Sequence, residues 1–240
     1  ILIIPAYNES EALPAVLRRI DEEDVDLQCV VVDDGSDDDT SGVARGHGAT
    51  VIRHAFNLGY GAALQTGYKY ALAEGAGFVV QMDADGQHDP REIRKLLEPV
   101  RQGTCDVMIG SRFLGSIGYE MGPVRHAGRW LFQSVGRLFG LSVTDPTSGF
   151  QAMNRAVIAH YTQDYFPSDY PDVDVLVGLQ RHGGIIHECP VCMTSATRES
   201  RIHGGLWPVY YVYKMILSFW SAGAKESLKA DRLENSIRKE

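Results

Sequence analysis

The chain has 240 residues, of which 44% are hydrophobic and 22% charged, and its formal net charge is −8. This length and apolar content are enough for one large domain with its own core, or for one domain with a short appendage, and we expect the second arrangement. The basic residues are scattered along the chain, which argues against the clustered positive charge of a nucleic-acid-binding protein.

Cysteine usage and the start of the chain indicate a reducing compartment. The four cysteines are too few and too dispersed for a disulfide framework. Cys189 and Cys192 form one C-x-x-C, but no second pair follows at zinc-finger spacing, so we interpret them as small apolar residues of a strand. No signal-peptide pattern opens the chain, and we therefore expect a cytoplasmic protein.

The first half of the chain alternates short apolar runs with helical patterns, which predicts βαβ units and a largely parallel sheet. Strands are expected at 1–4, 29–32, 50–53, 78–82 and 107–109. The first helix has its apolar stripe between Ala12 and Ile20, with Asn8 and Ser10 as candidate caps. Further helices are expected from Asp37 or Thr40 to the glycines around 47, at about 61–74, and from Pro90 onward.

The second half is less regular. A Gly-rich stretch at 110–128 precedes a predicted helix around 130–139 and a loop at 145–150, and the pattern then passes directly to a short helix near Ala156. A loop at 166–171, a helix at 172–182 and a strand at 184–191 follow. The order of elements remains that of an α/β protein.

The last segment reads as a separate unit. Residues 206–224 contain one charge, Lys214, and six aromatic side chains, and a polar, basic stretch follows. The segment is near the lower limit for crossing a bilayer, but Pro208 and the density of Tyr and Trp favour a helix at the membrane interface or one packed as core. We therefore divide the chain into a catalytic domain, 1–202, and an aromatic amphipathic helix with a polar tail, 203–240.

Four strand-like segments end in polar or acidic residues. These are Pro5-Ala6-Tyr7-Asn8-Glu9, Asp33-Asp34-Gly35-Ser36, Asp83-Ala84-Asp85 and Gly110-Ser111-Arg112. In a parallel sheet such ends converge on one edge, which predicts an acidic pocket with an arginine beside it. Oxygen ligands there suit Mg²⁺ or Mn²⁺ holding a diphosphate, although Asp and Gly are also ordinary turn residues.

On these motifs the chain resembles the family 2 inverting glycosyltransferases, particularly the branch of dolichol-phosphate mannose synthases and polyprenyl-phosphate glycosyltransferases, over about residues 1–202. The resemblance implies the glycosyltransferase A-type fold, an α/β architecture with a mostly parallel central sheet flanked by helices. It also implies metal-dependent, inverting transfer of a hexose or N-acetylhexosamine from a UDP- or GDP-linked donor to a polyprenyl phosphate such as dolichyl or undecaprenyl phosphate.

Two alternative functions remain open beside transfer to a polyprenyl phosphate. One is the same donor chemistry with a saccharide hydroxyl as acceptor in cell-surface polysaccharide assembly, and the other is a non-catalytic sugar-nucleotide-binding subunit. Nucleotidyltransferases share the fold but typically carry a glycine-rich basic loop after the first strand, where this chain has Pro5-Ala6-Tyr7-Asn8-Glu9.

The resemblance also assigns a donor site. Five residues would line the nucleotide pocket, with Asp34 accepting a hydrogen bond from the base: Pro5, Tyr7, Glu9, Val32 and Asp34. Asp83 would approach the ribose and sugar, and Ala84 is counted with the donor-binding residues. Asp85 and Gln87 would hold Mg²⁺ or Mn²⁺ against the diphosphate. Taken alone, Gln87 is equally an ordinary polar residue at a helix entrance.

The acceptor side would depend on cations, because guanidinium groups bind phosphates bidentately. The candidate cations, which would bind a lipid-phosphate acceptor or the donor diphosphate, are Arg112, Arg125, Arg129, Arg198 and Arg201. Ser148 is a further, uncharged candidate. Surface solvation is an equally good reading of Arg125 and Arg129. The pair Arg198 and Arg201 lacks the glycine-rich insertion that the family places between its two cations, which leaves their alignment open.

A general base is needed only for an alcohol acceptor, because a phosphate is already an anion near neutral pH. Asp172 and Asp174 are the candidates, and helix N-capping is the alternative for both. With Asp83, Asp85 and Arg112 they make up the predicted catalytic group. We expect the protein to lie on the cytoplasmic face of a membrane, assisted by a small membrane protein or by a homo-oligomer.

Overall fold

The computed structural model describes residues 1–23, 25–114, 137, 140–169 and 171–193. The chain divides into two units, Ile1–Arg198 and Glu199–Glu240, and all described residues belong to the first. Several predictions therefore fall outside the described residues: nearly all of the helix at 130–139, the aromatic segment at 206–224, and the phosphate-binding roles of Arg125, Arg129, Arg198 and Arg201.

The described residues form one seven-stranded sheet in the order β3-β2-β1-β4-β6-β5-β7. The strands are β1 (Leu2–Ala6), β2 (Cys29–Asp33), β3 (Thr50–Arg53), β4 (Phe78–Gln81), β5 (Val107–Ser111), β6 (Gln151–Asn154) and β7 (Ile186–Pro190). All pairings are parallel except those of β6, which runs antiparallel to both β4 and β5. The predicted α/β class with a mostly parallel sheet is confirmed.

Strand β6 is the element that the sequence pattern missed. Its residues, Gln151-Ala152-Met153-Asn154, contain no β-branched side chain and lie between a loop and a helix, so local propensity does not indicate a strand. The segment is extended because both of its edges find partners: Val80 faces Ala152 on one side, and Met108 faces it on the other. Tertiary pairing therefore decided the conformation.

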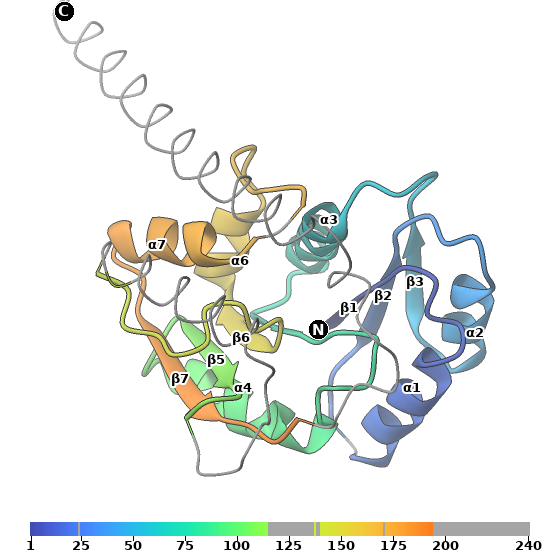
Figure 1. Ribbon diagram of the computed structural model, residues 1–240, viewed down its shortest axis with the longest axis horizontal. Helices are drawn as coiled ribbons and strands as arrows, with labels where there is room; N and C mark the ends of the chain where they lie inside the picture. Colours follow the sequence, from blue (N-terminus) through green and yellow to red (C-terminus); the bar gives the residue numbers. More distant parts are fainter. Residues whose placement is uncertain (24, 115–136, 138–139, 170, 194–240) are drawn as a thin grey trace, which may run out of the picture. The chain divides into compact units, whose positions relative to one another are not determined.

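Helices cover both faces of the sheet, as Figure 1 shows. Short 3-10 helix η1 (Pro90–Glu92) leads into α4, and the described helices are α1 (Leu13–Glu22), α2 (Thr40–Gly46), α3 (Tyr60–Ala73), α4 (Ile93–Arg101), α6 (Arg155–Tyr161) and α7 (Val173–Arg181). Helices α1, α2 and α4 contribute apolar side chains to one core layer, together with Leu2, Ile4 and Val80 of the strands. The opposite face is covered by α3 and α6.

The two faces follow from the alternation of side chains along a strand. Leu2 and Ile4 of β1 point into the layer of α1 and α4. Ile3, between them, points to the other face, where a Cβ placed on Gly67 of α3 would lie 2.5 Å from its Cγ2 atom. A glycine at 67 thus lets the middle of α3 lie directly on β1.

The predicted cap of the first helix is wrong. Helix α1 begins after Ala12 without a side-chain cap, and Pro14 lies in its first turn, where its missing N–H costs nothing. Asn8 and Ser10 instead bond to the loop that follows β2: Asn8 Oδ1 accepts from the amide of Asp37, and the amide of Ser10 donates to Asp38. These polar residues join two strand-end loops and do not start a helix.

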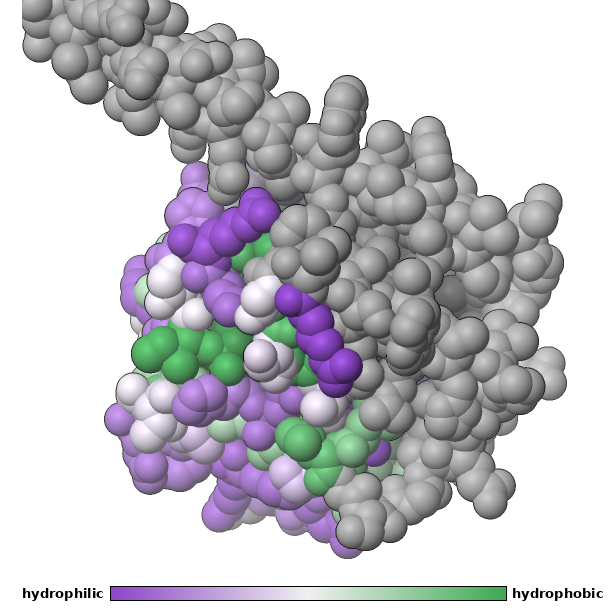
Figure 2. All heavy atoms as spheres, turned by 60° about the vertical axis from the view of Figure 1, so that its left-hand side comes forward, coloured by the Kyte–Doolittle hydropathy of each residue, from purple (hydrophilic) through white to green (hydrophobic). Residues whose placement is uncertain are grey.

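The described surface in Figure 2 is mostly hydrophilic, with small separate hydrophobic patches. Among the helices of the described chain, none has the length and apolar character required to cross a bilayer. The four cysteines are free thiols.

Candidate active site

The predicted convergence of strand ends is present in the structure. Strands β1, β2, β4 and β5 run in the same direction, so the loops that follow them leave the sheet at one edge. Because β6 is antiparallel, the loop that precedes it returns to the same edge, where the amide of Gly110 donates to the carbonyl of Phe150 at 2.8 Å. Five segments distant in sequence therefore meet there.

The loops after β1 and β2 are joined by side-chain hydrogen bonds. The amide of Asn8, which has a left-handed φ of 57°, donates to Ser36 Oγ at 2.9 Å. The amide of Ser10 donates to Asp38 Oδ2 at 3.0 Å. Burial acts to raise the pKa of Asp38, but hydrogen bonds from Thr40 and Ser10 outweigh it and lower the pKa to about 2. The floor of the predicted nucleotide pocket is thus a cross-linked pair of loops.

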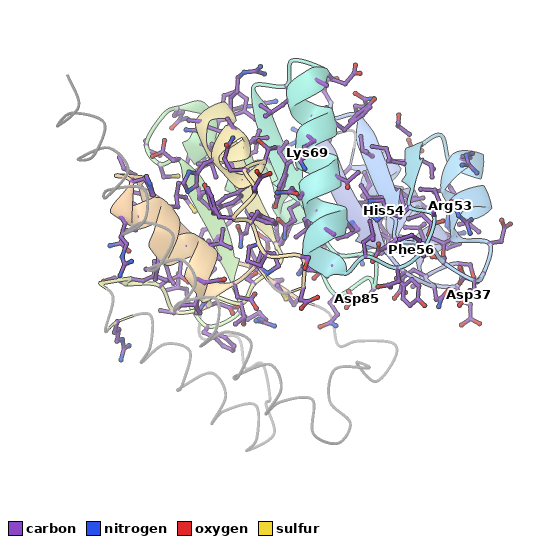
Figure 3. The ribbon with its side chains drawn as sticks, turned by 90° about the horizontal axis from the view of Figure 1, so that it is seen from above. Asp37, Arg53, His54, Phe56, Lys69 and Asp85 are labelled. Atoms are coloured by element: carbon purple, nitrogen blue, oxygen red, sulfur yellow. The ribbon has the colours of Figure 1, made fainter. Side chains whose placement is uncertain are left out.

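Asp34 is buried and anchors the loop that follows β3. Its carboxylate accepts from the amides of Leu58 and Gly59, both at 2.9 Å, and lies 2.7 Å from Nδ1 of His54. The other ring nitrogen of His54 lies 2.9 Å from Thr66 Oγ1 on α3, and Figure 3 shows His54 beside that helix. Asp34 therefore has a clear structural role, and its contact with a nucleotide base stays a prediction.

The remaining predicted donor residues divide by exposure. Pro5 and Val32 are buried in strands β1 and β2, and Ala84 is buried in the loop after β4. Tyr7 is 37% exposed, and the amide of Glu9 donates to the hydroxyl of Thr40 at 2.9 Å. Tyr7 is thus accessible to a ligand, whereas the backbone of Glu9 belongs to the loop junction.

Asp83 is held from two sides. The hydroxyl of Tyr60 donates to Asp83 Oδ1 at 2.7 Å, and the amide of Asp83 donates to His88 Nδ1 at 3.0 Å. The ring of His88 is stacked on Phe150, with centroids 4.8 Å apart. His88, at first sight a polar residue of a loop, is a buried support of the backbone at Asp83.

The two predicted metal ligands are in contact with each other. Gln87 donates to Asp85 through its backbone amide at 2.9 Å and through its side-chain amide at 2.6 Å. Burial, together with the negative charge of Asp83, raises the pKa of Asp85. Figure 3 shows Asp85 beside one end of α3.

This donor set fits a hard divalent cation. A half-buried carboxylate whose charge is disfavoured by a second carboxylate gains from a nearby cation, and the ligands available are oxygens of Asp85 and Gln87. Magnesium is commonly held by one or two carboxylates plus substrate phosphates. No cluster of three or more His, Cys, Asp or Glu side chains suitable for a metal occurs within the described residues.

Arg112 is fixed by an ion pair that the sequence analysis did not identify. Its Nε and one terminal nitrogen donate to the two oxygens of Asp145, each at 2.7 Å, and its backbone amide donates to the same carboxylate at 3.1 Å. Asp145 is fully buried, and the side chain of Arg112 is 22% exposed. The bidentate pair fixes the plane of the guanidinium group at the edge of the pocket.

Two further contacts hold the loop that carries Asp145. Glu188 on β7 accepts from the amides of Thr144 and Asp145 at 2.6 and 2.8 Å. The hydroxyl of Ser148 donates to the carbonyl of Gly110 at 2.6 Å, and Ser148 is buried. Ser148 thus shapes the loop, and its predicted contact with a phosphate stays a prediction.

Asp172 and Asp174 lie at the start of α7. Asp172 occupies the N-cap position, but its side chain makes no capping hydrogen bond, whereas Asp174 Oδ1 accepts from the amide of Asp172 at 3.2 Å. Burial and then the charge of Asp174 raise the pKa of Asp172 to about 8, against the opposing effect of Arg112. The charge of Asp83 also raises this pKa, so the two carboxylates lie near enough to interact electrostatically.

Sequence reasoning missed four residues that organise the pocket: His54, Tyr60, Asp145 and Glu188. His54 follows directly after β3, so its place at the carboxyl end of a parallel strand was an available signal. Asp145 begins a loop that the sequence analysis had marked. Nothing local distinguishes Tyr60 or Glu188, because their partners are 23 and 44 positions away along the chain.

A model of one protein family matches most of the chain. The family is described as glycosyl transferase family 2, and the match covers residues 1–162. An undecaprenyl-phosphate mannosyltransferase of Micrococcus luteus is 33% identical over 214 residues, which are 85% of this chain and 87% of that protein. A polyprenol monophosphomannose synthase of Mycolicibacterium smegmatis is 34% identical over 172 residues, 66% of this chain and 62% of that protein.

Solved structures share the fold. Glucosyl-3-phosphoglycerate synthase from Mycobacterium tuberculosis, in complex with Mn²⁺, uridine diphosphate and glucosyl-3-phosphoglycerate, aligns with a TM-score of 0.70 over 90% of this chain and 78% of that one. The same enzyme with Mg²⁺ and uridine diphosphate aligns with a TM-score of 0.67. The sequences are 21% and 20% identical, so this likeness concerns the fold, which is the glycosyltransferase A-type.

Proposed function

The chain belongs to glycosyl transferase family 2 and is a glycosyltransferase. On that premise we propose that it transfers a hexose or an N-acetylhexosamine from a nucleoside diphosphate to a polyprenyl phosphate, with inversion of the anomeric configuration. One observation carries the proposal. Asp83, Arg112, Asp145 and Asp172, from four separate segments, lie near enough together that the charges of the first three all affect the pKa of Asp172. Relatives that match most of this chain are named for transfer of mannose to such lipids.

The donor half of the proposal rests on Asp83 and Asp85. Asp83 would accept hydrogen bonds from hydroxyl groups of the nucleotide sugar, and Asp85 with Gln87 would hold Mg²⁺ or Mn²⁺. When bound, the cation would offset the charge that builds on the leaving nucleoside diphosphate. Relatives in fold have been crystallised with either metal and uridine diphosphate, which supports a divalent cation here.

The acceptor half rests on Arg112. Its guanidinium plane is held by Asp145, so it would present a fixed positive edge to a phosphate and would lose little side-chain entropy on binding. A lipid phosphate is an anion near neutral pH, so it needs orientation and charge compensation more than it needs a base. Attack by its oxygen on the anomeric carbon, from the face opposite the leaving group, would give inversion.

The direct test is transfer of labelled sugar. Purified protein is incubated with Mn²⁺, undecaprenyl or dolichyl phosphate in detergent, and a panel of UDP- and GDP-sugars, and lipid-linked product is measured. We expect product with one donor and none with the Asp85→Ala variant, in which nucleotide plus Mn²⁺ also no longer raises Tm. Donor-dependent stabilisation of the wild type without any transfer would instead favour a sugar-nucleotide-binding subunit.

A second candidate function is transfer to a saccharide hydroxyl. The observation in its favour is Asp172, which is half-buried and has its pKa raised to about 8. Its ionised form, populated as the pH approaches that value, is a stronger base than an ordinary carboxylate and can accept a hydroxyl proton. Asp172→Asn would then abolish turnover while nucleotide binding persists. If the acceptor is a lipid phosphate, the same variant would retain most of its activity.

The remaining parts of the proposal concern location. We infer that the enzyme works at the cytoplasmic surface of a membrane, because a polyprenyl acceptor is embedded there, and that the aromatic segment 206–224 lies in the interface. A small membrane protein or a second copy of the chain would assist. Release from membranes by high salt alone would argue against hydrophobic anchoring by this segment.

A further inference from the structure

We propose that Tyr60 is a positioning residue that fixes the Asp83 carboxylate for the nucleotide sugar, and that Gln81 and Tyr68 orient its hydroxyl through a one-way chain of hydrogen bonds. The inference rests on the proposed contact between Asp83 and the donor. It adds three side chains to the site that no sequence motif marks.

The chain of contacts runs from the core to the pocket. Tyr68, on α3 and 1% exposed, donates its hydroxyl proton to Oε1 of Gln81, which lies on β4 and is 4% exposed. Nε2 of Gln81 donates to the hydroxyl of Tyr60 at 3.3 Å. Tyr60 in turn donates to Asp83 Oδ1 at 2.7 Å.

The direction of this chain follows from the last acceptor. An ionised carboxylate only accepts, so the proton of the Tyr60 hydroxyl must point at Asp83. The oxygen of Tyr60 therefore accepts from Gln81, and the amide of Gln81 must turn its nitrogen toward Tyr60 and its oxygen toward Tyr68. Each donor in such a chain is polarised by the one before it, which strengthens the final bond to Asp83.

Crowding around the pair shows that its position is built into the fold. A Cβ on Gly149 would lie 2.8 Å from Asp83 Oδ2 and 2.8 Å from the Tyr60 hydroxyl. Only a glycine at this position lets the loop before β6 pass so close. His88 holds the backbone amide of Asp83, so Tyr60 fixes the side chain of a residue whose main chain is already fixed.

The consequence concerns the cost of binding. The Asp83 side chain is 31% exposed and so is accessible from the pocket. His88 Nε2 lies 3.6 Å from the other carboxylate oxygen, Oδ2, whereas the Tyr60 hydroxyl donates to Oδ1 at 2.7 Å. Without the shorter of these contacts the carboxylate would be held less closely, and the donor would have to bear part of the cost of ordering it. A hydrogen bond to a charged group is worth roughly 1.5–3 kcal/mol, and the exposure of Asp83 favours the lower end, so we expect about tenfold weaker donor binding.

The test is a double-mutant cycle on donor binding. Affinity for UDP-sugar and GDP-sugar with Mn²⁺ is measured by calorimetry for the wild type, Tyr60→Phe, Asp83→Ala and the double variant, and KM and kcat follow for the active forms. We expect Tyr60→Phe to weaken binding about tenfold in the wild type and not at all in the Asp83→Ala background. A merely structural role would lower affinity or Tm equally in both backgrounds.

Two further variants keep the result interpretable. Tyr70→Phe makes the same change on the same helix, at a hydroxyl that accepts from Gln28 Nε2 at 3.1 Å, and should leave donor binding unchanged. Gly149→Ala keeps every polar group but displaces the Asp83–Tyr60 pair, and should weaken donor binding as Tyr60→Phe does. If Tyr60→Phe does not fold, donor binding by Gly149→Ala shows whether the position of the Asp83 carboxylate matters.

The outcomes separate this inference from the proposed function. If the wild type binds a nucleotide sugar, and the Tyr60→Phe and Gly149→Ala variants each bind it as tightly, only the positioning role of Tyr60 is refuted. Additive losses in the cycle refute it too. A folded wild-type chain that binds no nucleotide sugar refutes the proposed function, and the inference falls with it.

Discussion

Replacing Asp145 by alanine should destabilise the protein and weaken catalysis together, because Asp145 is the buried partner of Arg112. Two unit charges about 4 Å apart interact by about 4 kcal/mol at an effective dielectric constant of 20. Part of this Coulomb energy is offset because Asp145 lost its hydration when it was buried. An exposed pair is worth about 0–1 kcal/mol, while breaking a fully buried one costs about 3–5 kcal/mol.

The geometry places this pair between those limits. Asp145 is fully buried and Arg112 is 22% exposed, and the carboxylate accepts two side-chain bonds at 2.7 Å. We therefore expect Asp145→Ala to lower the free energy of unfolding by about 2–3 kcal/mol. For a chain of this size that corresponds to a fall in Tm of about 4–12 °C.

The measurement is urea unfolding followed by circular dichroism, with sugar transfer assayed in parallel. The urea midpoint should fall with an unchanged m value, and kcat/KM should fall because Arg112 loses its fixed orientation. Arg91→Met is the matched control: Arg91 also makes a bidentate contact with a buried carboxylate, that of Asp89, but is itself 70% exposed. Asp89 keeps a second cation, Arg19, at 3.1 Å, so the removal of Arg91 should leave the midpoint unchanged. An Asp145→Ala midpoint equal to that of the wild type would refute the reasoning.

Two more predictions concern pH and backbone strain. Burial and the charge of Asp174 raise the pKa of Asp172 to about 8, whereas the pKa of an Asp in the unfolded chain is about 3.9. Between these two pH values the folded chain holds a proton that the unfolded chain has lost, so the stability of the fold falls as the pH rises. Asp172→Asn should therefore match the wild type in urea at pH 4 and exceed it by about 1 kcal/mol or more at pH 9; a pH-independent difference would contradict this. Gly35 has a φ of 73°, and a Cβ there would lie 2.5 Å from the carbonyl carbon of Phe56, while Gly48 has a φ of 80° and open space around it. Gly35→Ala should hence cost about 1–3 kcal/mol more than Gly48→Ala in thermal or urea unfolding, and equal costs would show that φ alone matters.

The sequence predicted most of the fold because its signals are local and periodic. The apolar runs of β1, β2 and β4 and the helical stripes of α1 and α4 indicate their own conformation. Strand β6 was missed because its four residues have no such signal and become a strand only between two partners. The caps assigned to Asn8 and Ser10 were wrong for a related reason, since a neighbouring loop competes for the same polar groups.

The candidate site likewise contains residues that the sequence placed and residues that only the tertiary structure revealed. The sequence by itself determined where acidic residues follow strands, because a parallel sheet brings the carboxyl ends of its strands to one edge. It therefore placed Asp83, Asp85 and Arg112 at that edge, and their functional roles stay predictions. Only the tertiary structure decided what holds them: Tyr60 for Asp83, Asp145 for Arg112, and Glu188 for the loop of Asp145. A hydrogen bond depends on distance and angle in space, and those are fixed by the packing of segments far apart in the chain.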